Sequence, residues 1–179
     1  YLWGDTLNGY LSDMIVAQAY ALYNHQIIRD RIFAILKKLC KAKCVESLFT
    51  THNYISVCED YPMLRKGAVE AAEGERFCLP FNMRDGIAIC VGKGNADWNC
   101  SAPHGAGRAM SRNAAKKNIG MDDFEMSMSG IFSTSVCPGT LDESPQAYKS
   151  MEEILRLIEP TAEVITMVKP RINIKDIPQ

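Results

Sequence analysis

The chain has 179 residues, of which 47% are hydrophobic and 23% charged, and its formal net charge is −1 at pH 7. These values are typical of a soluble globular protein with a substantial core. No apolar run approaches the roughly 18 residues of a membrane-spanning helix, and the net charge leaves any nucleic-acid contact to local patches.

The first residues and the cysteines bear on the compartment in which the protein acts. The first residues lack the basic and apolar regions of a signal peptide and lack an initiator Met, which fits a processed product or a fragment. No cysteine pair has the Cys-x-x-Cys spacing of a zinc ribbon, so we expect reduced thiols in a cytoplasmic protein. The seven cysteines are Cys40, Cys44, Cys58, Cys78, Cys90, Cys100 and Cys137.

A helical pattern dominates the first part of the chain. Apolar residues recur at helical spacing from Leu7 to Leu39, which predicts one long helix. Asp5 or Thr6 is expected to cap its start. From Leu48 to Ile55 the pattern becomes strand-like or irregular.

Short strands are predicted next. Residues 67–72 and 76–80 flank the turn Glu73-Gly74, and this order predicts a β-hairpin. The apolar run Ile87–Val91 is bounded by glycines and predicts a buried strand.

The second half is expected to alternate helix and strand. A helix is predicted from Arg108 to Lys117, and another from Ser144 to Ile158 with Ser144 as its N-cap. Residues 163–168 read as a strand. We therefore expect one α+β domain over residues 1–179, with a mixed sheet flanked by helices.

The segment Ser101-Ala-Pro-His-Gly-Ala-Gly-Arg-Ala-Met-Ser-Arg112 has the strongest chemical character. Its glycines allow backbone N–H groups to approach a ligand, and the N-terminus of a helix favours a phosphate. Arg108 and Arg112, four residues apart, would share one helix face and hold that phosphate. Residues 93–118 carry five cationic side chains against Asp97, a local charge of +4.

His104 stands directly before the Gly-Ala-Gly loop. A neutral imidazole has a free nitrogen that can attack phosphorus and form an N–P bond. The residues alone leave three interpretations open for His104: a nucleophile, a phosphate ligand or a structural histidine.

Two other segments give weaker signals. His52 has a side chain suited to metal ligation, but one histidine does not define a metal site, and a structural role is favoured on residues alone. Lys66, in Arg65-Lys-Gly67, either contacts phosphate or lies in a solvated turn.

Several motifs in the same order resemble the RtcB-type RNA-splicing ligases, and together they extend over most of the chain. They are Tyr10-Leu-Ser-Asp-Met14, Ala17-Gln-Ala-Tyr20, Thr51-His-Asn-Tyr54, Arg65-Lys-Gly-Ala68, Pro80-Phe-Asn-Met-Arg-Asp-Gly86, Gly92-Lys-Gly-Asn95, Pro103-His-Gly-Ala-Gly-Arg-Ala-Met-Ser-Arg112, Asp142-Glu-Ser-Pro-Gln-Ala-Tyr-Lys149 and Asn173-Ile-Lys175.

The resemblance implies an RtcB-like fold and a reaction. Such enzymes join RNA ends with a 3′-phosphate or 2′,3′-cyclic phosphate to 5′-hydroxyl ends, with GTP and Mn²⁺. His104 would carry GMP as a phosphoramidate, His52 would be a Mn²⁺ ligand, and Lys66, Arg108 and Arg112 would bind RNA or phosphate. The residues implied in nucleotide binding are Asn53, Pro80, Phe81, Asn82, Met83, Gly105, Ala106, Gly107, Tyr148 and Lys175.

The chain departs from the family pattern in two respects. The other metal ligands of the family, a cysteine and two histidines in upstream motifs, have no counterpart here, so we expect the C-terminal part of a longer enzyme, incomplete at its N-terminus and inactive alone. Ile87 stands where relatives commonly have a serine that touches the nucleotide. Losing one such hydrogen bond costs roughly 0.5–1.5 kcal/mol.

Two alternatives belong to other classes. One is a degenerate nucleotide- or RNA-binding module that has lost catalysis, and the other is a phosphotransfer enzyme that uses His104 without RNA. An accessory protein is also a possible partner, and no membrane partner is expected.

Overall fold

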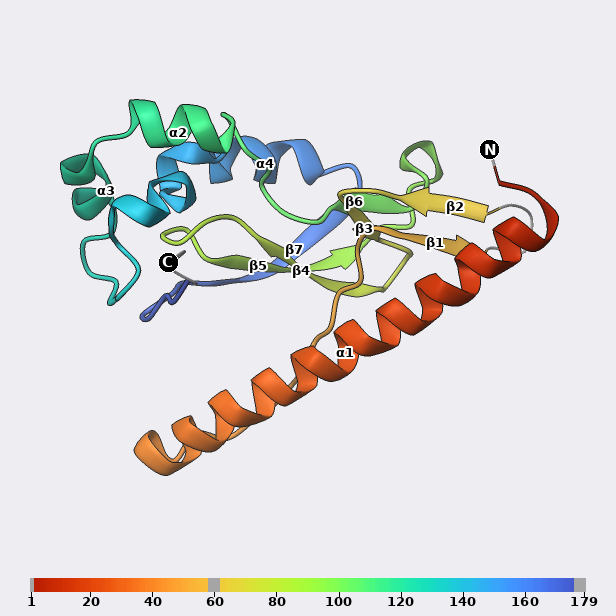
Figure 1. Cartoon of the computed structure of the whole chain (residues 1–179), viewed down its shortest axis with the longest axis horizontal. Coiled ribbons are helices and arrows are strands. Elements are labelled where there is room, and N and C mark those ends of the chain that lie inside the picture. The colour runs from red at the N-terminus through yellow and green to blue at the C-terminus, as the bar shows by residue number, and fades with distance from the viewer. Residues whose placement is uncertain (1, 58–61, 176–179) are drawn as a thin grey trace. The chain divides into compact units, whose positions relative to one another are not determined.

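The structure, a computed structural model, describes residues 2–57 and 62–175. Cys58 therefore lies outside the described residues. The chain divides into two compact units, Tyr1–Lys66 and Gly67–Gln179, and Figure 1 labels their elements. The single domain expected over residues 1–179 stays a prediction.

The first unit is built on the predicted long helix. This helix, α1 (Gly4–Cys40), has no buried residue. Lys41 caps its C-terminus with a left-handed backbone (φ 54°) and donates its N–H to the Lys37 carbonyl. The predicted side-chain cap is wrong: the N-cap is Trp3, and Asp5 already lies in the first turn, where its charge suits the helix dipole.

After α1 the chain is irregular until an antiparallel pair of strands. This pair consists of β1 (Tyr54–Val57) and β2 (Pro62–Arg65), with Tyr54 opposite Arg65. Arg65 is buried, donates a hydrogen bond to Ser56 Oγ at 2.6 Å and lies 5.8 Å from the Tyr54 ring centroid.

The second unit contains a three-stranded antiparallel sheet in the order β4-β5-β7 (Figure 1). Its strands are β4 (Arg76–Pro80), β5 (Ile87–Gly92) and β7 (Ala162–Val168). The buried strand predicted at Ile87–Val91 and the strand predicted at 163–168 are therefore confirmed. The pairing of β5 with β7 is irregular between Ile89 and Cys90.

The predicted hairpin is wrong in its pairing. The strand β3 (Ala68–Glu70) pairs with β6 (Ser101–Pro103), whereas β4 pairs with β5. Backbone bonds just beyond β3 continue this arrangement, because Ala71 donates to the Cys100 carbonyl and accepts from Gly94. Gly92 is needed at this crossing, since a Cβ there would lie 2.3 Å from the Ala71 carbonyl carbon.

Helices α2 (Arg112–Asn118) and α4 (Met151–Ile158) both begin later than predicted. In each case the hydroxyl of the serine just before the helix accepts a hydrogen bond from the backbone N–H three residues later. Ser111 accepts from Ala114, and Ser150 accepts from Glu153. Ser144, the predicted cap, instead precedes the short 3₁₀ helix η3 (Pro145–Ala147) and makes no side-chain cap bond.

The remaining helical segments complete the second unit. They are η1 (Ala96–Trp98), α3 (Met121–Ser127) and η2 (Pro138–Glu143). The side chain of Phe124 in α3 is fully buried and forms a small core cluster with Met83 and Met128.

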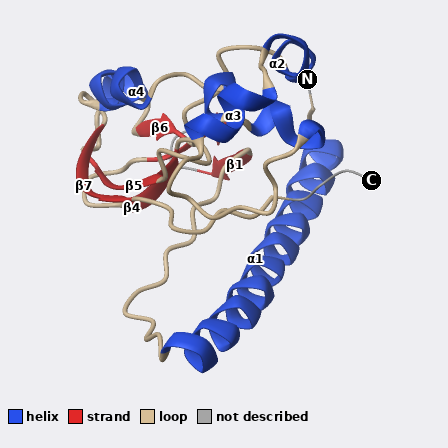
Figure 2. Cartoon of the chain, turned by 90° about the vertical axis from the view of Figure 1, so that its left-hand side faces the viewer, coloured by secondary structure: helices blue, strands red, loops and turns tan. Residues whose placement is uncertain are grey.

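The main core lies between the sheet and α4, which Figure 2 shows beside the β4-β5-β7 sheet. Helix α4 buries Ile154 and Ile158 against Phe77, Leu79 and Cys90. The expected α+β class is thus confirmed. The strands form three small antiparallel sheets in the part of the chain that the structure describes, where the sequence predicted one mixed sheet. Of the described helices, none combines the length and the apolar character needed to cross a membrane.

Candidate functional site

A pocket of about 590 Å³ lies in the second unit, a volume within the range of small-molecule sites. It gathers residues from the end of β4, the loop after β6, the segment after η3 and the segment after β7. The lining residues are Pro80, Phe81, Asn82, Met83, Gly86, Ile87, His104, Gly105, Ala106, Gly107, Arg108, Glu143, Tyr148, Val168, Pro170, Ile172, Asn173 and Lys175.

The loop that carries His104 is fixed to the end of β4. Ala106 donates its N–H to the Pro80 carbonyl at 3.0 Å, and a Cβ on Gly105 would lie 3.1 Å from that same oxygen. The His104 N–H donates to the Gly67 carbonyl at 3.3 Å. These bonds hold the histidine and the small residues after it against one wall of the pocket.

A closed turn forms the neighbouring wall. Phe81 donates to the Gly86 carbonyl at 2.9 Å, and Asn82 Oδ1 accepts hydrogen bonds from the N–H groups of Arg84 and Asp85 at 3.0 and 2.9 Å. A hydrogen bond from Arg84 lowers the pKa of Asp85 against the opposing effect of burial. Phe81 and Met83 are buried, so this turn presents a firmly packed edge to the pocket.

Arg108 does not lie on a helix with Arg112, contrary to the prediction. Its backbone forms an isolated antiparallel bridge with Tyr148, in which Ala109 donates to the Ala147 carbonyl and Lys149 to the Gly107 carbonyl. The extended backbone that this bridge requires delays the start of α2 to Arg112. The Arg108 guanidinium carbon lies 4.9 Å from the Tyr148 ring centroid, a cation–π distance.

The two arginines meet nonetheless, on a pair of carboxylates. We call Asp142 and Glu143 the acidic pair; both are shielded from solvent, with side chains 7% and 17% exposed. Glu143 Oε1 accepts from Arg108 and from Arg112, each at 2.8 Å. Asp142 Oδ2 accepts from Arg112 at 2.6 Å, and its carbonyl accepts from Arg108 at 2.6 Å.

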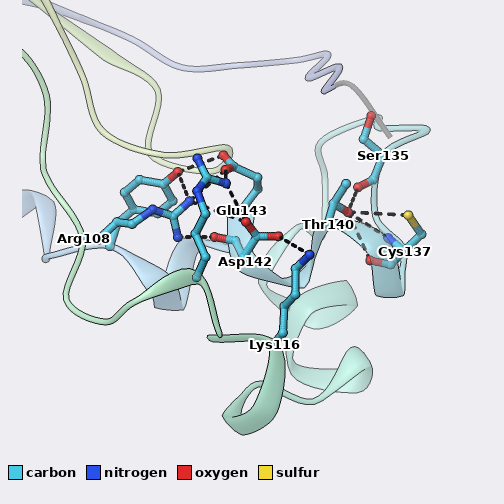
Figure 3. Close-up of polar contacts among 9 residues, drawn as sticks. Arg108, Lys116, Ser135, Cys137, Thr140, Asp142 and Glu143 are labelled. Atoms are coloured by element: carbon cyan, nitrogen blue, oxygen red, sulfur yellow. Dashed lines mark hydrogen bonds and ion pairs between the residues drawn. The ribbon is translucent and has the colours of Figure 1, made fainter. Parts of the chain in front are cut away.

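Two lysines and a tyrosine complete this cluster. Glu143 Oε2 accepts a hydrogen bond from the Tyr148 hydroxyl at 2.8 Å and pairs with Lys175 Nζ at 3.3 Å. Lys116 Nζ lies 3.5 Å from Asp142 Oδ1, and Figure 3 shows Lys116 and Arg108 approaching the acidic pair from different segments. Four cationic side chains thus face two carboxylates, an excess of two positive charges that suits a phosphate ligand.

The cluster shifts the titration of its members. Burial alone would raise the pKa of Glu143, but the hydrogen bond from Tyr148 and the charges of Lys175 and Arg112 bring it below its ordinary value. The pKa of Asp142 is likewise lowered by Arg112 and Lys116 against burial. Burial and the Glu143 carboxylate raise the pKa of Tyr148 to about 12, so its hydroxyl keeps its proton at neutral pH.

The C-terminal segment brings Lys175 to the pocket. Lys175 donates its N–H to Ser135 Oγ at 2.8 Å, and that hydroxyl donates back to the Lys175 carbonyl at 2.9 Å. Asn173 Oδ1 is buried at the pocket and has no hydrogen-bond partner among the described residues. Ile87 also lines the pocket, so the apolar side chain noted in the sequence lies where a ligand would contact it.

The remaining sequence candidates do not line this pocket. Arg112 contacts the acidic pair, and Lys66 is an exposed residue at the end of the first unit. His52 and Asn53 line a separate pocket of about 240 Å³ within the first unit. Nowhere in residues 2–57 and 62–175 do three or more His, Cys, Asp or Glu side chains gather as metal ligands.

Sequence reasoning missed the acidic pair, Asn173 as a pocket residue and the apolar residues Val168, Pro170 and Ile172. The pair Asp142-Glu143 is visible in the sequence as two adjacent acidic residues, but no local pattern connects them with Arg108 and Arg112. The excess of cations over residues 93–118 was the available signal. Arginines that are shielded from solvent need carboxylate partners, and this segment does not supply enough of them, so the partners must come from elsewhere in the chain.

Comparison with known proteins assigns the chain to a family. The sequence profile of the family described as tRNA-splicing ligase RtcB matches residues 4–176. The RNA-splicing ligase RtcB of Escherichia coli K12 is 28% identical over 182 residues, covering 96% of this chain and 44% of that protein. The tRNA-splicing ligase RtcB of Nanoarchaeum equitans is 27% identical over 83% of this chain and 38% of its own length.

A third relative, the tRNA-splicing ligase RtcB of Methanopyrus kandleri, is 36% identical over 86 residues, 45% of this chain and 9% of that protein. The chain thus spans less than half the length of the relatives it matches. Because the family profile covers nearly all of its residues, the chain belongs to the tRNA-splicing ligase RtcB family.

Proposed function

We propose that this chain forms part of an RNA ligase that joins 3′-phosphate or 2′,3′-cyclic phosphate ends to 5′-hydroxyl ends, with GTP as the source of energy. The observation that carries the proposal is one pocket that collects His104, the small-residue loop 105–107, Tyr148 and Lys175 beside a cluster with excess positive charge. Family membership and the names of the relatives support it.

The pocket suits a guanine nucleotide in size and in polar groups. Its volume of about 590 Å³ lies within the range for small-molecule sites. Asn173 Oδ1 is a buried acceptor without a partner among the described residues, which a base amine or a ribose hydroxyl would satisfy. Pro80, Phe81, Asn82 and Met83 would form the wall beside the nucleotide.

In the proposed reaction a lone pair on the His104 imidazole attacks the α-phosphorus of GTP. An N–P bond forms while the bond to pyrophosphate breaks. A 2′,3′-cyclic phosphate end is first opened by water to a 3′-phosphate. An oxygen of the RNA 3′-phosphate then attacks the phosphorus of the GMP and releases the histidine. The RNA 5′-hydroxyl finally attacks the phosphorus of the RNA 3′-phosphate, which forms the new phosphodiester bond and releases GMP. Arg108 and Arg112 would stabilise the charge that develops on the phosphates in each transfer, and Lys66 would contact RNA phosphate.

The family implies Mn²⁺, which neutralises phosphate charge in such reactions. The described residues do not fit a complete manganese site, because none of their His, Cys, Asp and Glu side chains form a group of three or more. We propose His52 as one metal ligand and Asn53 as its neighbour near the nucleotide, on the resemblance alone. The 179 residues by themselves are therefore proposed to be inactive.

The test is an RNA-joining assay on the full-length protein that carries this chain. RNA with a 3′-phosphate and RNA with a 5′-hydroxyl should be joined with GTP and Mn²⁺, and the His104→Ala variant should not join them. Glu153→Gln, an exposed change on α4, is the matched control and should join them at the wild-type rate. The ligase proposal would be overturned if the wild-type protein bound RNA and GTP without joining the ends, which fits a binding module, or transferred the γ-phosphate of ATP to His104.

The proposed place of action is the cytoplasm, and an accessory protein remains a proposed partner. Reduced thiols support this location, since the buried Cys90 is a free thiol.

A further inference from the structure

Glu143 connects four side chains that sequence resemblance assigns to the nucleotide or to phosphate. One carboxylate oxygen, Oε1, accepts from Arg108 and Arg112, and the other, Oε2, binds the Tyr148 hydroxyl and Lys175 Nζ. Glu143 lines the pocket as well, so the carboxylate lies at the wall where a ligand would bind.

The four partners depend on Glu143 to different degrees. Arg108 has further contacts, since it also donates to the Asp142 carbonyl and lies over the Tyr148 ring. Arg112 also pairs with Asp142. The arginines would therefore keep much of their arrangement without the Glu143 carboxylate.

Tyr148 and Lys175 rely on Glu143 more strongly. Lys175 is fixed through its backbone by Ser135, but its four-carbon side chain reaches the pocket wall through the ion pair with Glu143 at 3.3 Å. The Tyr148 hydroxyl accepts from Arg108 at 3.3 Å and donates to Glu143 at 2.8 Å, so the acceptor that fixes the direction of its proton is Glu143.

We propose that Glu143 is a positioning residue for nucleotide binding, which holds the Lys175 ammonium and the Tyr148 hydroxyl at the pocket before GTP arrives. This inference rests on the proposed function, because it takes GTP as the ligand of the pocket. A long lysine side chain loses much rotamer freedom when it is held in one place. Because Glu143 already restrains the lysine in the free protein, GTP binding does not have to include this loss of rotamer entropy.

The experiment measures guanylylation of His104 in the full-length protein as a function of GTP concentration. Glu143→Gln keeps the shape of the side chain but removes the charge that holds Lys175, and its single amide oxygen can accept from Tyr148 or from the arginines but not from both. We expect the GTP concentration at half-maximal rate to rise about tenfold, because Lys175 then loses its rotamer freedom only when GTP binds, with a maximal rate within about threefold of wild type. Glu153→Gln removes an exposed carboxylate of α4 and should leave both quantities unchanged.

A double-mutant cycle separates positioning from general destabilisation. If Glu143 acts through Lys175, adding Glu143→Gln to Lys175→Met should raise the half-maximal GTP concentration little beyond Lys175→Met alone. The inference would be overturned if the fold-changes of the two single variants multiplied in the double variant, or if Glu143→Gln left the half-maximal GTP concentration unchanged. If Glu143→Gln does not fold, Tyr148→Phe tests the same arrangement, because removal of its hydroxyl should raise the half-maximal concentration several-fold, and an unchanged value would overturn the inference.

The outcomes distinguish this inference from the proposed function. A wild-type protein that forms no guanylate adduct contradicts the proposed function and the inference with it. An adduct in the wild type together with wild-type GTP dependence in Glu143→Gln overturns the positioning role alone.

Discussion

Gly86 gives the sharpest test of the pocket's architecture. Its φ is +83°, and a Cβ at this position would lie 2.1 Å from the Val168 carbonyl oxygen and 3.0 Å from Pro170 Cδ. Gly130 provides a matched control, because its φ is also +83° but a Cβ there would meet nothing within 4 Å. The two Gly→Ala variants therefore share the backbone cost and differ in the steric overlap.

The left-handed backbone costs an alanine about 1–2 kcal/mol, and forcing atoms into packed structure adds about 1–3 kcal/mol. We therefore expect Gly130→Ala to lower the free energy of unfolding by about 1–2 kcal/mol and Gly86→Ala by about 2–5 kcal/mol. Urea denaturation followed by circular dichroism measures both values. Equal losses in the two variants would show that the close approach of Gly86 to β7 has no effect on stability, contrary to this prediction.

Other predictions concern charge, thiol reactivity and the core. The pKa values of Asp142 and Glu143 lie below their ordinary values, so the stability they contribute is present above their unfolded pKa values of about 4 and is lost as the pH falls through the folded values. The urea concentration at half-unfolding should therefore fall when the pH is lowered below about 4, and this fall should be smaller in Asp142→Asn than in the wild type. An equal fall in both proteins would contradict this prediction. Burial raises the pKa of Cys90 to about 11, and a hydrogen bond with Thr140 lowers that of Cys137. Iodoacetamide at neutral pH should thus modify Cys137 before Cys90, as followed by peptide mass spectrometry, and equal rates for these two thiols would count against the assignment. Phe77→Ala, at a core position 1% exposed, should cost about 3–5 kcal/mol in urea denaturation, and a loss below about 1 kcal/mol would contradict the described core.

The parts of the fold that local patterns determine were predictable from the sequence. The long helix α1 follows from helical spacing of apolar residues, and β5 follows from an apolar run between two glycines. In both, the physical cause lies within a short stretch of chain, so a window of neighbouring residues contains the needed information.

Pairing across long distances in the sequence was not predictable in this way. Residues 67–72 look like one arm of a hairpin, but the backbone of β3 pairs with β6, some thirty residues further along. The bridge between Arg108 and Tyr148 joins residues forty positions apart and imposes extended backbone where the local pattern favours a helix. A tertiary contact overrides local propensity at both places.

The same reason explains what was missed at the candidate site. His104 and the small-residue loop 105–107 were evident from local composition, and the resemblance added the pocket residues Tyr148 and Lys175. The acidic pair was not evident, because Asp142 and Glu143 meet the arginines across 30 to 35 positions of sequence. Charge balance depends on which segments fold together, and no local pattern shows that.

Under the proposed function, His104 is the nucleophile that takes up the guanylate. The most direct measurement is mass spectrometry of peptides from the full-length protein after incubation with GTP and Mn²⁺. We expect a GMP adduct on the peptide that carries His104 and no adduct in the His104→Ala variant. An adduct that persists in this variant, or one that maps to a different residue, would contradict it.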